Sequence, residues 1–262
     1  MDNTEQVQPE EISREQKTDH HRTVIIVGAS SGIGFETALR LLGRGYAIAN
    51  ISRTPCTLGH VKNYTADVTD GHSLEKAIAQ IASESELYGL IYCAGFSMAA
   101  PIEYAEERDY RYLFEVNYFG ALRAIKSVAP HLKKRGGRIL IVSSMGGTFP
   151  VAFDSFYSSS KAAVDMLVKS AEMELEPFHI HVSAVQPGGT STGFTRAAAV
   201  LADMEQGGRS AGEVAKQVAD VFCDKKPPLL IQCGAWNKLF AAANRILPGK
   251  TSLYINKKIY KQ

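Results

Sequence analysis

The chain has 262 residues, of which 45% are hydrophobic and 21% charged, so it is long enough to bury a sizeable core in one α/β domain. The net charge of +2, without basic clusters interleaved with aromatic residues, gives no indication of nucleic-acid binding. No apolar run approaches the roughly 18 residues that span a bilayer. Four cysteines without a Cys-x-x-Cys pair fit a reducing cytoplasm, and no ligand spacing predicts a metal site. We therefore expect a soluble, cytoplasmic protein.

The chain predicts a short tail followed by one domain. Residues 1–22 hold few aliphatic side chains among many Glu, Gln, Asp and Lys, so they bury too little surface to offset the entropy of ordering. We expect a disordered tail over residues 1–22 and a single domain over residues 23–262, with a C-terminal extension from about residue 235.

Within the domain, short apolar runs alternate with helical patterns. The expected strands are residues 23–27, 46–51, 90–93, 138–142, 180–185 and 229–233. The expected helices run from a glycine turn to about Leu42, from near Tyr157 to Pro177, and from a capping box of Ser210 and Glu213 through Phe222. Parallel strands joined by right-handed crossovers are the economical arrangement, so the pattern predicts an α/β fold with a doubly wound parallel sheet and helices on both faces.

A glycine-rich turn lies where the first strand meets the first helix. Gly28 permits the tight exit from the strand, Gly32 lets the backbone approach a pyrophosphate, and Gly34 allows the helix to pack closely on the sheet. The N–H groups at the start of the helix then face the anion. The turn predicts a nucleotide site with the contact residues Gly28, Ser30, Ser31, Gly32, Ile33 and Gly34.

The end of the second strand indicates which nucleotide is preferred. An NAD-preferring site usually has an acidic residue there, which accepts a hydrogen bond from the ribose 2′-hydroxyl. Here the residues are Asn50, Ile51, Ser52 and Arg53. No carboxylate repels a 2′-phosphate and the Arg53 guanidinium suits one, so the sequence favours NADP(H) over NAD(H). The alternative is an arginine that is merely solvated in a loop.

Ser144, Tyr157 and Lys161 form the most informative chemical pattern. Tyr157 and Lys161 are one helical turn apart and share a face, and Ser144 closes an apolar strand thirteen residues before the tyrosine. Tyr254 and Lys258 repeat the Tyr-x-x-x-Lys spacing, but an alanine stands where the serine would be. Only the first match therefore predicts a site of proton transfer.

Several motifs follow one another at spacings that are characteristic as a set: Gly28-x-x-x-Gly32-x-Gly34, Asp67-Val68, Ala94-Gly95, Asn117, Ser144, Tyr157-x-x-x-Lys161 and Pro187-Gly188. In this combination the chain resembles the short-chain dehydrogenase/reductase family, in its compact single-domain branch, from about Thr23 to Cys233. The resemblance implies a Rossmann-type sheet and a nicotinamide cofactor. It also implies a homodimer or homotetramer built on the helices that hold Asn117 and Tyr157.

The resemblance further assigns the cofactor contacts: the adenine to Asp67 and Val68, the ribose to Ala94 and Gly95, the nicotinamide carboxamide and diphosphate to Thr190 and Thr192 after Pro187 and Gly188, with Asn117, Tyr157 and Lys161 completing the site.

Three positions depart from the family pattern. Val27 replaces a threonine, Tyr92-Cys93 replace an asparagine pair, and Ser159 replaces an alanine. The second departure removes a polar side chain that in the family ties the sheet to the turn.

The resemblance implies a mechanism centred on Tyr157. Hydride transfer to a carbonyl carbon leaves an oxygen that must take a proton, and a tyrosine with a pKa of about 10 gives one up reluctantly near neutrality. The Lys161 ammonium and the positive charge of the oxidised nicotinamide favour tyrosinate and lower that barrier. By the family pattern, Ser144 hydrogen-bonds the substrate oxygen and Asn117 holds a water that links Lys161 to solvent.

The substrate is expected to be apolar. Residues 96–104, 148–156 and 189–206 are rich in Phe, Met, Ala and Val, which favours an acyl thioester ketone, a steroid-like or other lipid ketone, or a xenobiotic carbonyl. The predicted activity is hydride transfer between NADP(H) and such a carbonyl or its secondary alcohol. The alternatives are a catalytically silent NADP-binding sensor or scaffold, and an epimerase or dehydratase of the wider family.

The last part of the chain, residues 236–260, mixes aliphatic with basic side chains. We expect this segment to pack on its own domain, with docking on a membrane surface or a partner as the alternative.

Overall fold

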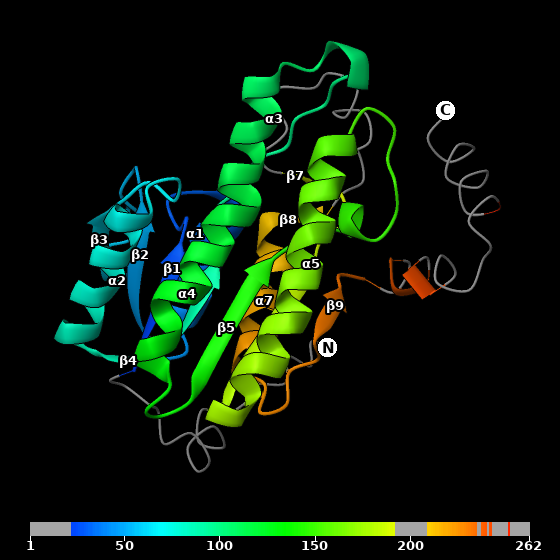
Figure 1. The fold of residues 1–262 in the computed structure, drawn as a ribbon. Coiled ribbons are helices and arrows are strands. Elements are labelled where there is room, and N and C mark those ends of the chain that lie inside the picture. Colours follow the sequence, from blue (N-terminus) through cyan, green and yellow to red (C-terminus); the bar gives the residue numbers. More distant parts are fainter. Residues whose placement is uncertain (1–21, 192–208, 235–236, 240, 243–250, 252–262) are drawn as a thin grey trace, which may run out of the picture.

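A seven-stranded parallel sheet with the order β3-β2-β1-β4-β5-β6-β9 forms the centre of the protein (Figure 1). The structure is a computed structural model, and it describes residues 22–191, 209–234, 237–239, 241–242 and 251. The strands are β1 (Arg22–Val27), β2 (Ala47–Ser52), β3 (Val61–Thr65), β4 (Glu86–Tyr92), β5 (Gly137–Val142), β6 (Ile180–Gln186) and β9 (Leu230–Gln232). A separate parallel pair joins β7 (Thr190–Ser191) and β8 (Arg209–Ser210).

Helices cover both faces of the sheet, as Figure 1 shows. One face carries α2 (Gly71–Glu84), α4 (Gly120–Leu132) and α5 (Ser155–Leu175), and the other carries α1 (Gly32–Leu42) and α7 (Ala211–Cys223). Successive side chains of β1 alternate between the two cores, with Ile25 and Val27 in one and Val24 and Ile26 in the other. The predicted α/β doubly wound sheet, Rossmann-type and with helices on both faces, is confirmed.

The six predicted strands are present, and the sequence missed one strand of the sheet. Five of the six begin and end within one residue of the predicted bounds. The sixth, β4, begins at Glu86 instead of Leu90. The missed strand is β3, an edge strand in which only Val61 is fully buried, so it carries no apolar run to detect. Arg22, which the sequence assigned to the tail, opens β1, and residues 1–21 lie outside the described part of the chain.

The predicted helices are present as well. α5 ends at Leu175, and Pro177 stands in the short 3₁₀ turn that follows. The capping box of α7 is formed: the Glu213 N–H donates to Ser210 Oγ at 3.2 Å, and the Ser210 N–H donates to Glu213 Oε2 at 2.9 Å. None of the described helices is long and apolar enough to cross a bilayer.

Between β4 and β5 the chain forms a long helical run with a π turn inside it. α3 (Glu107–Phe114) passes into the π turn η2 (Glu115–Phe119) and then into α4. A Cβ on Gly120 would lie 2.2 Å from the Tyr92 hydroxyl, which donates to the Val116 carbonyl at 2.7 Å. The absent side chain thus lets the helix approach β4. π turns inside helices are frequent at functional sites, and this one carries Asn117.

Candidate active site

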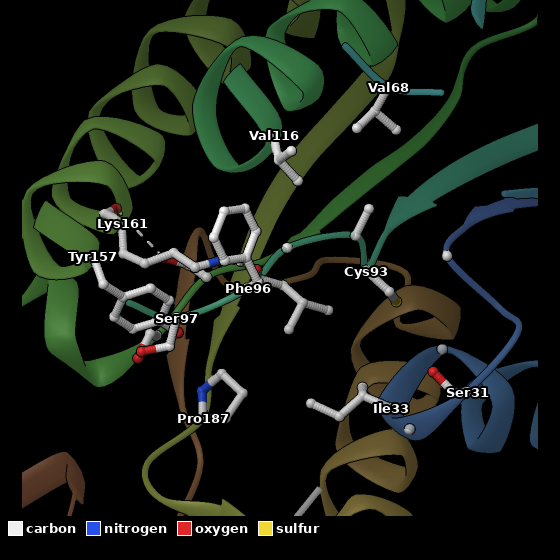
Figure 2. Close-up of a pocket in the computed structure, with 18 of the residues that line it drawn as sticks. Ser31, Ile33, Val68, Cys93, Phe96, Ser97, Val116, Tyr157, Lys161 and Pro187 are labelled. Atoms are coloured by element: carbon white, nitrogen blue, oxygen red, sulfur yellow. Dashed lines mark hydrogen bonds between the residues drawn. The ribbon is translucent and has the colours of Figure 1, made fainter. Parts of the chain in front are cut away.

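A cavity of about 910 Å³ opens at the carboxyl ends of the strands. Its wall is made by the residues that follow β1 to β6, together with the start of α5. In a doubly wound sheet ligands bind at this edge, where the strand order reverses, which here is between β1 and β4. Figure 2 shows Ser31, Ile33 and Cys93 at one end of the cavity and Tyr157 and Lys161 at the other.

The glycine turn forms the first end of the cavity. Gly28 and Gly32 have positive φ angles of 92° and 56°, which favour glycine. A Cβ on Gly34 would lie 2.1 Å from the Gly28 carbonyl oxygen, so α1 packs directly on the turn. Ser31 is the N-cap of α1 but makes no side-chain capping bond, which leaves the first N–H groups of the helix available to an anion. This cradle fits the pyrophosphate of a dinucleotide.

Asn50 at the end of β2 holds this turn in place. Its side chain is fully buried, and its Oδ1 accepts a hydrogen bond from the Ala29 N–H at 2.9 Å. Its Nδ2 donates to Ser52 Oγ and Asn63 Oδ1, both at 2.8 Å. Asn50 therefore supplies a side-chain link between sheet and turn, in place of the polar side chain that the Tyr92-Cys93 pair at the end of β4 lacks. The sequence signal was an amide inside an otherwise apolar strand.

Arg53 projects from the end of β2 into the same region. Its Nη1 lies 3.9 Å from Asp67 Oδ2 and donates to the Tyr112 hydroxyl at 3.3 Å, while the side chain stays 71% exposed. Burial would raise the pKa of Asp67, but hydrogen bonds from Thr69 and the charge of Arg53 lower it below its ordinary value. Asp67, the residue predicted to contact the adenine, is thus ionised. Tyr112 also belongs to this end of the cavity, although the sequence did not indicate it.

The structure brings most of the predicted cofactor residues to this one cavity. Those that line it are Gly28, Ser30, Ser31, Gly32, Ile33, Gly34, Arg53, Asp67, Val68, Ala94, Gly95, Tyr157, Lys161, Pro187 and Gly188. Thr190 is placed by its backbone in β7 and Thr192 lies outside the described residues. Asn117 is buried behind the wall.

Tyr157 lies on the first turn of α5, opposite the turn that follows β5. Ser144 caps that turn, accepting from the Gly146 N–H at 3.1 Å, and its hydroxyl is hydrogen-bonded to Tyr157. Burial raises the pKa of Tyr157, the Ser144 contact lowers it, and the carboxyls of Asp154 and Asp165 raise it again, so that the net direction is upward. The protein's own groups therefore keep the phenol protonated, which is the form that a carbonyl reduction consumes.

Lys161 follows one turn later and is 3% exposed. Its Nζ donates to the Val142 carbonyl at 3.0 Å and lies 5.6 Å from the centre of the Tyr157 ring. Burial lowers the pKa of Lys161 to about 8, against opposing effects of Asp165 and Cys93. The amine keeps its proton near neutrality, so it can act as the positive charge beside the phenol.

Asn117 joins three elements that carry the site. Its Nδ2 donates to the Phe96 carbonyl at 3.0 Å and to Ser160 Oγ at 3.1 Å, and its Oδ1 accepts from the Phe96 N–H at 3.0 Å. Ser160 Oγ in turn donates to the Tyr157 carbonyl at 2.8 Å. The amide thus fastens the segment after β4 and the start of α5 to η2. That Asn117 holds a water for Lys161 stays a prediction.

Two buried carboxyls beside the tyrosine were missed by the sequence analysis. Asp165 accepts from Gln186 Nε2 at 2.6 Å, and burial raises its pKa to about 6. Asp154 accepts from Ser97 Oγ at 3.4 Å, and burial raises its pKa to about 7. Their helical spacing was a usable signal, because Asp154 precedes Tyr157 by three residues and Asp165 follows Lys161 by four.

Comparison with known proteins agrees with this geometry. Residues 22–200 match the family model described as short chain dehydrogenase. The chain is 31% identical over 255 residues to a 3-ketodihydrosphingosine reductase of Bacteroides thetaiotaomicron, covering 88% of this chain and 95% of the relative. It is 32% identical to human retinol dehydrogenase 8 over 189 residues, which cover 66% of this chain and 60% of that relative. It therefore spans nearly all of the first relative and about 60% of the second.

Solved structures share the fold at low sequence identity. A short chain dehydrogenase from Burkholderia cenocepacia in complex with NADP superimposes with a TM-score of 0.79 at 24% identity, covering 90% of this chain and 96% of that one. ElxO with NADP bound gives a TM-score of 0.73 at 23% identity, covering 81% and 97%. The chain therefore belongs to the short-chain dehydrogenase/reductase family, whose members are oxidoreductases of carbonyl and alcohol substrates.

Proposed function

We propose that the protein transfers hydride between NADP(H) and the carbonyl or secondary-alcohol carbon of an apolar substrate. One observation carries the proposal: Ser144, Tyr157 and Lys161 line one end of a cavity whose other end is the glycine turn. A proton donor and a dinucleotide cradle then share a single space. This is the arrangement that a hydride transfer coupled to a proton transfer needs.

The cofactor end supports NADP(H). When bound, the cofactor supplies or accepts the hydride, and the glycine turn, Asp67 and Gly95 would hold it. β2 ends in Ser52 and Arg53, without a carboxylate, and the guanidinium is exposed enough to reach a 2′-phosphate. Two proteins of the same fold contain NADP in their solved structures, which supports the same preference.

At the catalytic end, Tyr157 donates the proton that the carbonyl oxygen takes up in reduction, and accepts it back in oxidation. Ser144, already hydrogen-bonded to the phenol, contacts the same substrate oxygen. Lys161 places a positive charge beside the ring, which stabilises tyrosinate after the proton has left. Asn117 and Ser160 hold α5 and the segment after β4 at their working separation.

The wall beyond Tyr157 supports an apolar substrate. Phe96, Met145, Phe149 and Val151 line the cavity there. The relatives named for 3-ketodihydrosphingosine and for retinol point in the same direction. A lipid-like ketone or alcohol is therefore the substrate class that we infer.

The test has two steps. Titration of the purified protein with NADPH and NADH should give a dissociation constant at least about tenfold lower for NADPH, because a 2′-phosphate adds charge-assisted hydrogen bonds. A panel of ketones with increasing chain length should then support NADPH oxidation, with kcat/KM rising with length. Cofactor binding without oxidation by any carbonyl would favour the sensor or scaffold alternative. A preference for small charged carbonyls would overturn the apolar substrate.

We also infer a homodimer or homotetramer. Met166 and Met173 on α5 are 59% and 73% exposed, and Phe119 at the end of η2, just before α4, is 39% exposed. Exposed apolar side chains on neighbouring helices favour an interface. Light scattering at micromolar concentration should give a mass of two or four chains, and a monomer would contradict the inference.

A further inference from the structure

Asp154 is a buried carboxyl at the substrate end of the cavity, and the proposed catalytic steps do not use it. It is 6% exposed and lines the cavity one helical turn before Tyr157. Ser97, which is labelled beside Tyr157 in Figure 2, donates to its Oδ1 at 3.4 Å. Burying a carboxylate without a positively charged partner costs free energy of folding, so such a group is more often kept for binding or catalysis than for stability.

The backbone around Asp154 is built to aim it. The preceding residue, Phe153, has a φ of 64°, a left-handed conformation that bulky residues rarely adopt. The Phe153 carbonyl accepts from the Ala100 N–H at 2.8 Å, which pins this turn to the segment after β4. Asp154 is also the N-cap of α5, yet its side chain makes no capping hydrogen bond, whereas Asp70 and Ser210 do cap their helices. The carboxyl is therefore turned away from the usual local role and toward the cavity.

The partners of Asp154 within the protein do not balance its charge. In the described ranges no lysine, arginine or histidine nitrogen lies within 4.0 Å of its carboxylate oxygens, and the one side-chain hydrogen bond it accepts there is the long one from Ser97. Lys161, the nearest catalytic amine along the helix, donates to the Val142 carbonyl. A carboxylate offers about four acceptor positions, so most of its capacity stays available to a ligand.

The charge of Asp154 also works against Tyr157. It raises the pKa of the phenol, which is the opposite of what the hydrogen bond with Ser144 does. For the protein alone, a negative group at this place would slow the loss of the phenolic proton. A cation bound against Asp154 would offset both this effect and the cost of burial.

We propose that Asp154 binds a positively charged amino group on a carbon close to the reacting carbonyl, so that the substrates are 2-amino ketones and 2-amino alcohols with an apolar tail. The inference rests on the proposed function and names its substrate class. Asp154, the N-cap of α5, and Tyr157, three residues later, both line the cavity, so a group held by the carboxylate lies near the oxygen held by the phenol. The apolar tail then follows Met145, Phe149 and Val151.

The test compares three ketones with the same alkyl tail under saturating NADPH: a 2-amino ketone, a 2-hydroxy ketone and the unsubstituted ketone. The readout is the ratio of kcat/KM for the 2-amino ketone to that for the unsubstituted one. Asp154→Asn should lower this ratio by about 10- to 100-fold, the loss expected for one charge-assisted hydrogen bond, and mostly through KM. The matched control Asp109→Asn removes an exposed carboxylate from α3 and should leave the ratio unchanged.

Equal losses for all three ketones would overturn the inference, because Asp154 would then only position Tyr157. Equal preference of the wild type for the 2-hydroxy ketone would overturn it too, since a neutral donor would suffice. NADPH titration of the variant confirms that its fold is retained. If the wild type reduces the unsubstituted ketone but does not prefer the 2-amino one, this inference fails and the proposed function stands.

Calorimetry provides a measurement that needs neither a variant nor turnover. A 2-amino alcohol should bind the complex of wild-type protein and NADPH, in which no hydride acceptor is present, at least about tenfold more tightly than the alcohol without the amino group. Equal or weaker binding of the amino alcohol would overturn the inference. Absence of any carbonyl reduction together with tighter amino alcohol binding would instead count against the proposed function alone.

Discussion

The two ends of the cavity differ in what they offer to a ligand. At the cofactor end the contacts come from backbone, and the side chains that matter are the ones that are absent, at Gly28, Gly32 and Gly34. At the catalytic end they come from buried titratable side chains, and burial shifts the pKa of Asp154 to about 7 and that of Lys161 to about 8. One end depends on shape and the other on charge.

This difference predicts how each end fails. A glycine turn is damaged by added atoms, because a Cβ at Gly28 or Gly34 meets backbone atoms that cannot move aside. The catalytic end is damaged by removed atoms, because each polar group there stabilises a particular protonation state of a neighbour. Substitutions at the two ends should therefore separate cofactor affinity from turnover.

The largest effect is expected at the catalytic end. Tyr157→Phe removes the proton donor but keeps the ring, so carbonyl reduction should fall by about 10²- to 10⁴-fold while NADPH affinity changes by less than about threefold. Steady-state kinetics and a fluorescence titration measure the two quantities. Tyr64→Phe, which removes a hydroxyl that contacts Glu84 away from the cavity, should leave both unchanged. Undiminished turnover of Tyr157→Phe would refute its assignment.

The next effect should appear at the cofactor end. Gly34→Ala places a Cβ 2.1 Å from the Gly28 carbonyl oxygen, so the turn must open and NADPH affinity should fall by about 10- to 100-fold. Gly43→Ala is the matched control in the same helix region, where the nearest atom would be 3.5 Å from the new Cβ. If both variants bind NADPH like the wild type, the turn does not depend on shape.

A smaller effect is expected where the cofactor end does use a side chain. Arg53→Ala should weaken NADPH binding by about tenfold and leave NADH binding unchanged, because only the former carries a phosphate for the guanidinium. Arg111→Ala, an exposed arginine of α3 that pairs with Glu107, controls for the loss of one positive charge. Equal weakening of both cofactors would show that Arg53 is structural.

The smallest effect concerns stability. The folded-state pKa of Asp154, about 7, lies above its ordinary value of 3.8, so the carboxyl binds more protons in the folded than in the unfolded chain between these values. The wild-type protein therefore loses stability as pH rises from 3.8 to about 7. An asparagine at this position does not titrate, so the variant does not share this loss. Asp154→Asn should raise Tm by about 4–8 °C near pH 8 and by about a third of that near pH 5. Equal shifts at both pH values would mean that the gain is not electrostatic.

Much of the fold was predictable because its signals are local. Six of the seven strands of the sheet and the helices α1, α5 and α7 follow from apolar runs, glycine stops and one capping box, and the structure confirms them. β3 escaped because an edge strand with exposed polar residues carries no apolar run. The early part of β4 escaped for a similar reason, since Glu86 and Gly89 interrupt the pattern.

The site divides in the same way. Ser144, Tyr157, Lys161 and the glycine turn were found from spacing, because one helical turn and one strand-to-helix turn are geometries that a sequence displays. Asn50 and Tyr112 were not selected, since their partners lie 21 and 59 residues away along the chain. Pairing over such separations depends on the strand order, which periodicity does not reveal.

By itself the sequence determined the doubly wound sheet, the grouping of Ser144, Tyr157 and Lys161, and the glycine turn, because each depends on residues close to one another along the chain. The tertiary structure alone decided that Asp154 is buried next to Tyr157 with no cation from the described residues at its side, and that Asn117 fastens η2 to Phe96 and Ser160. Burial and the charges of distant neighbours set a pKa, and both arise only when the strands have assembled and the helices have packed against them.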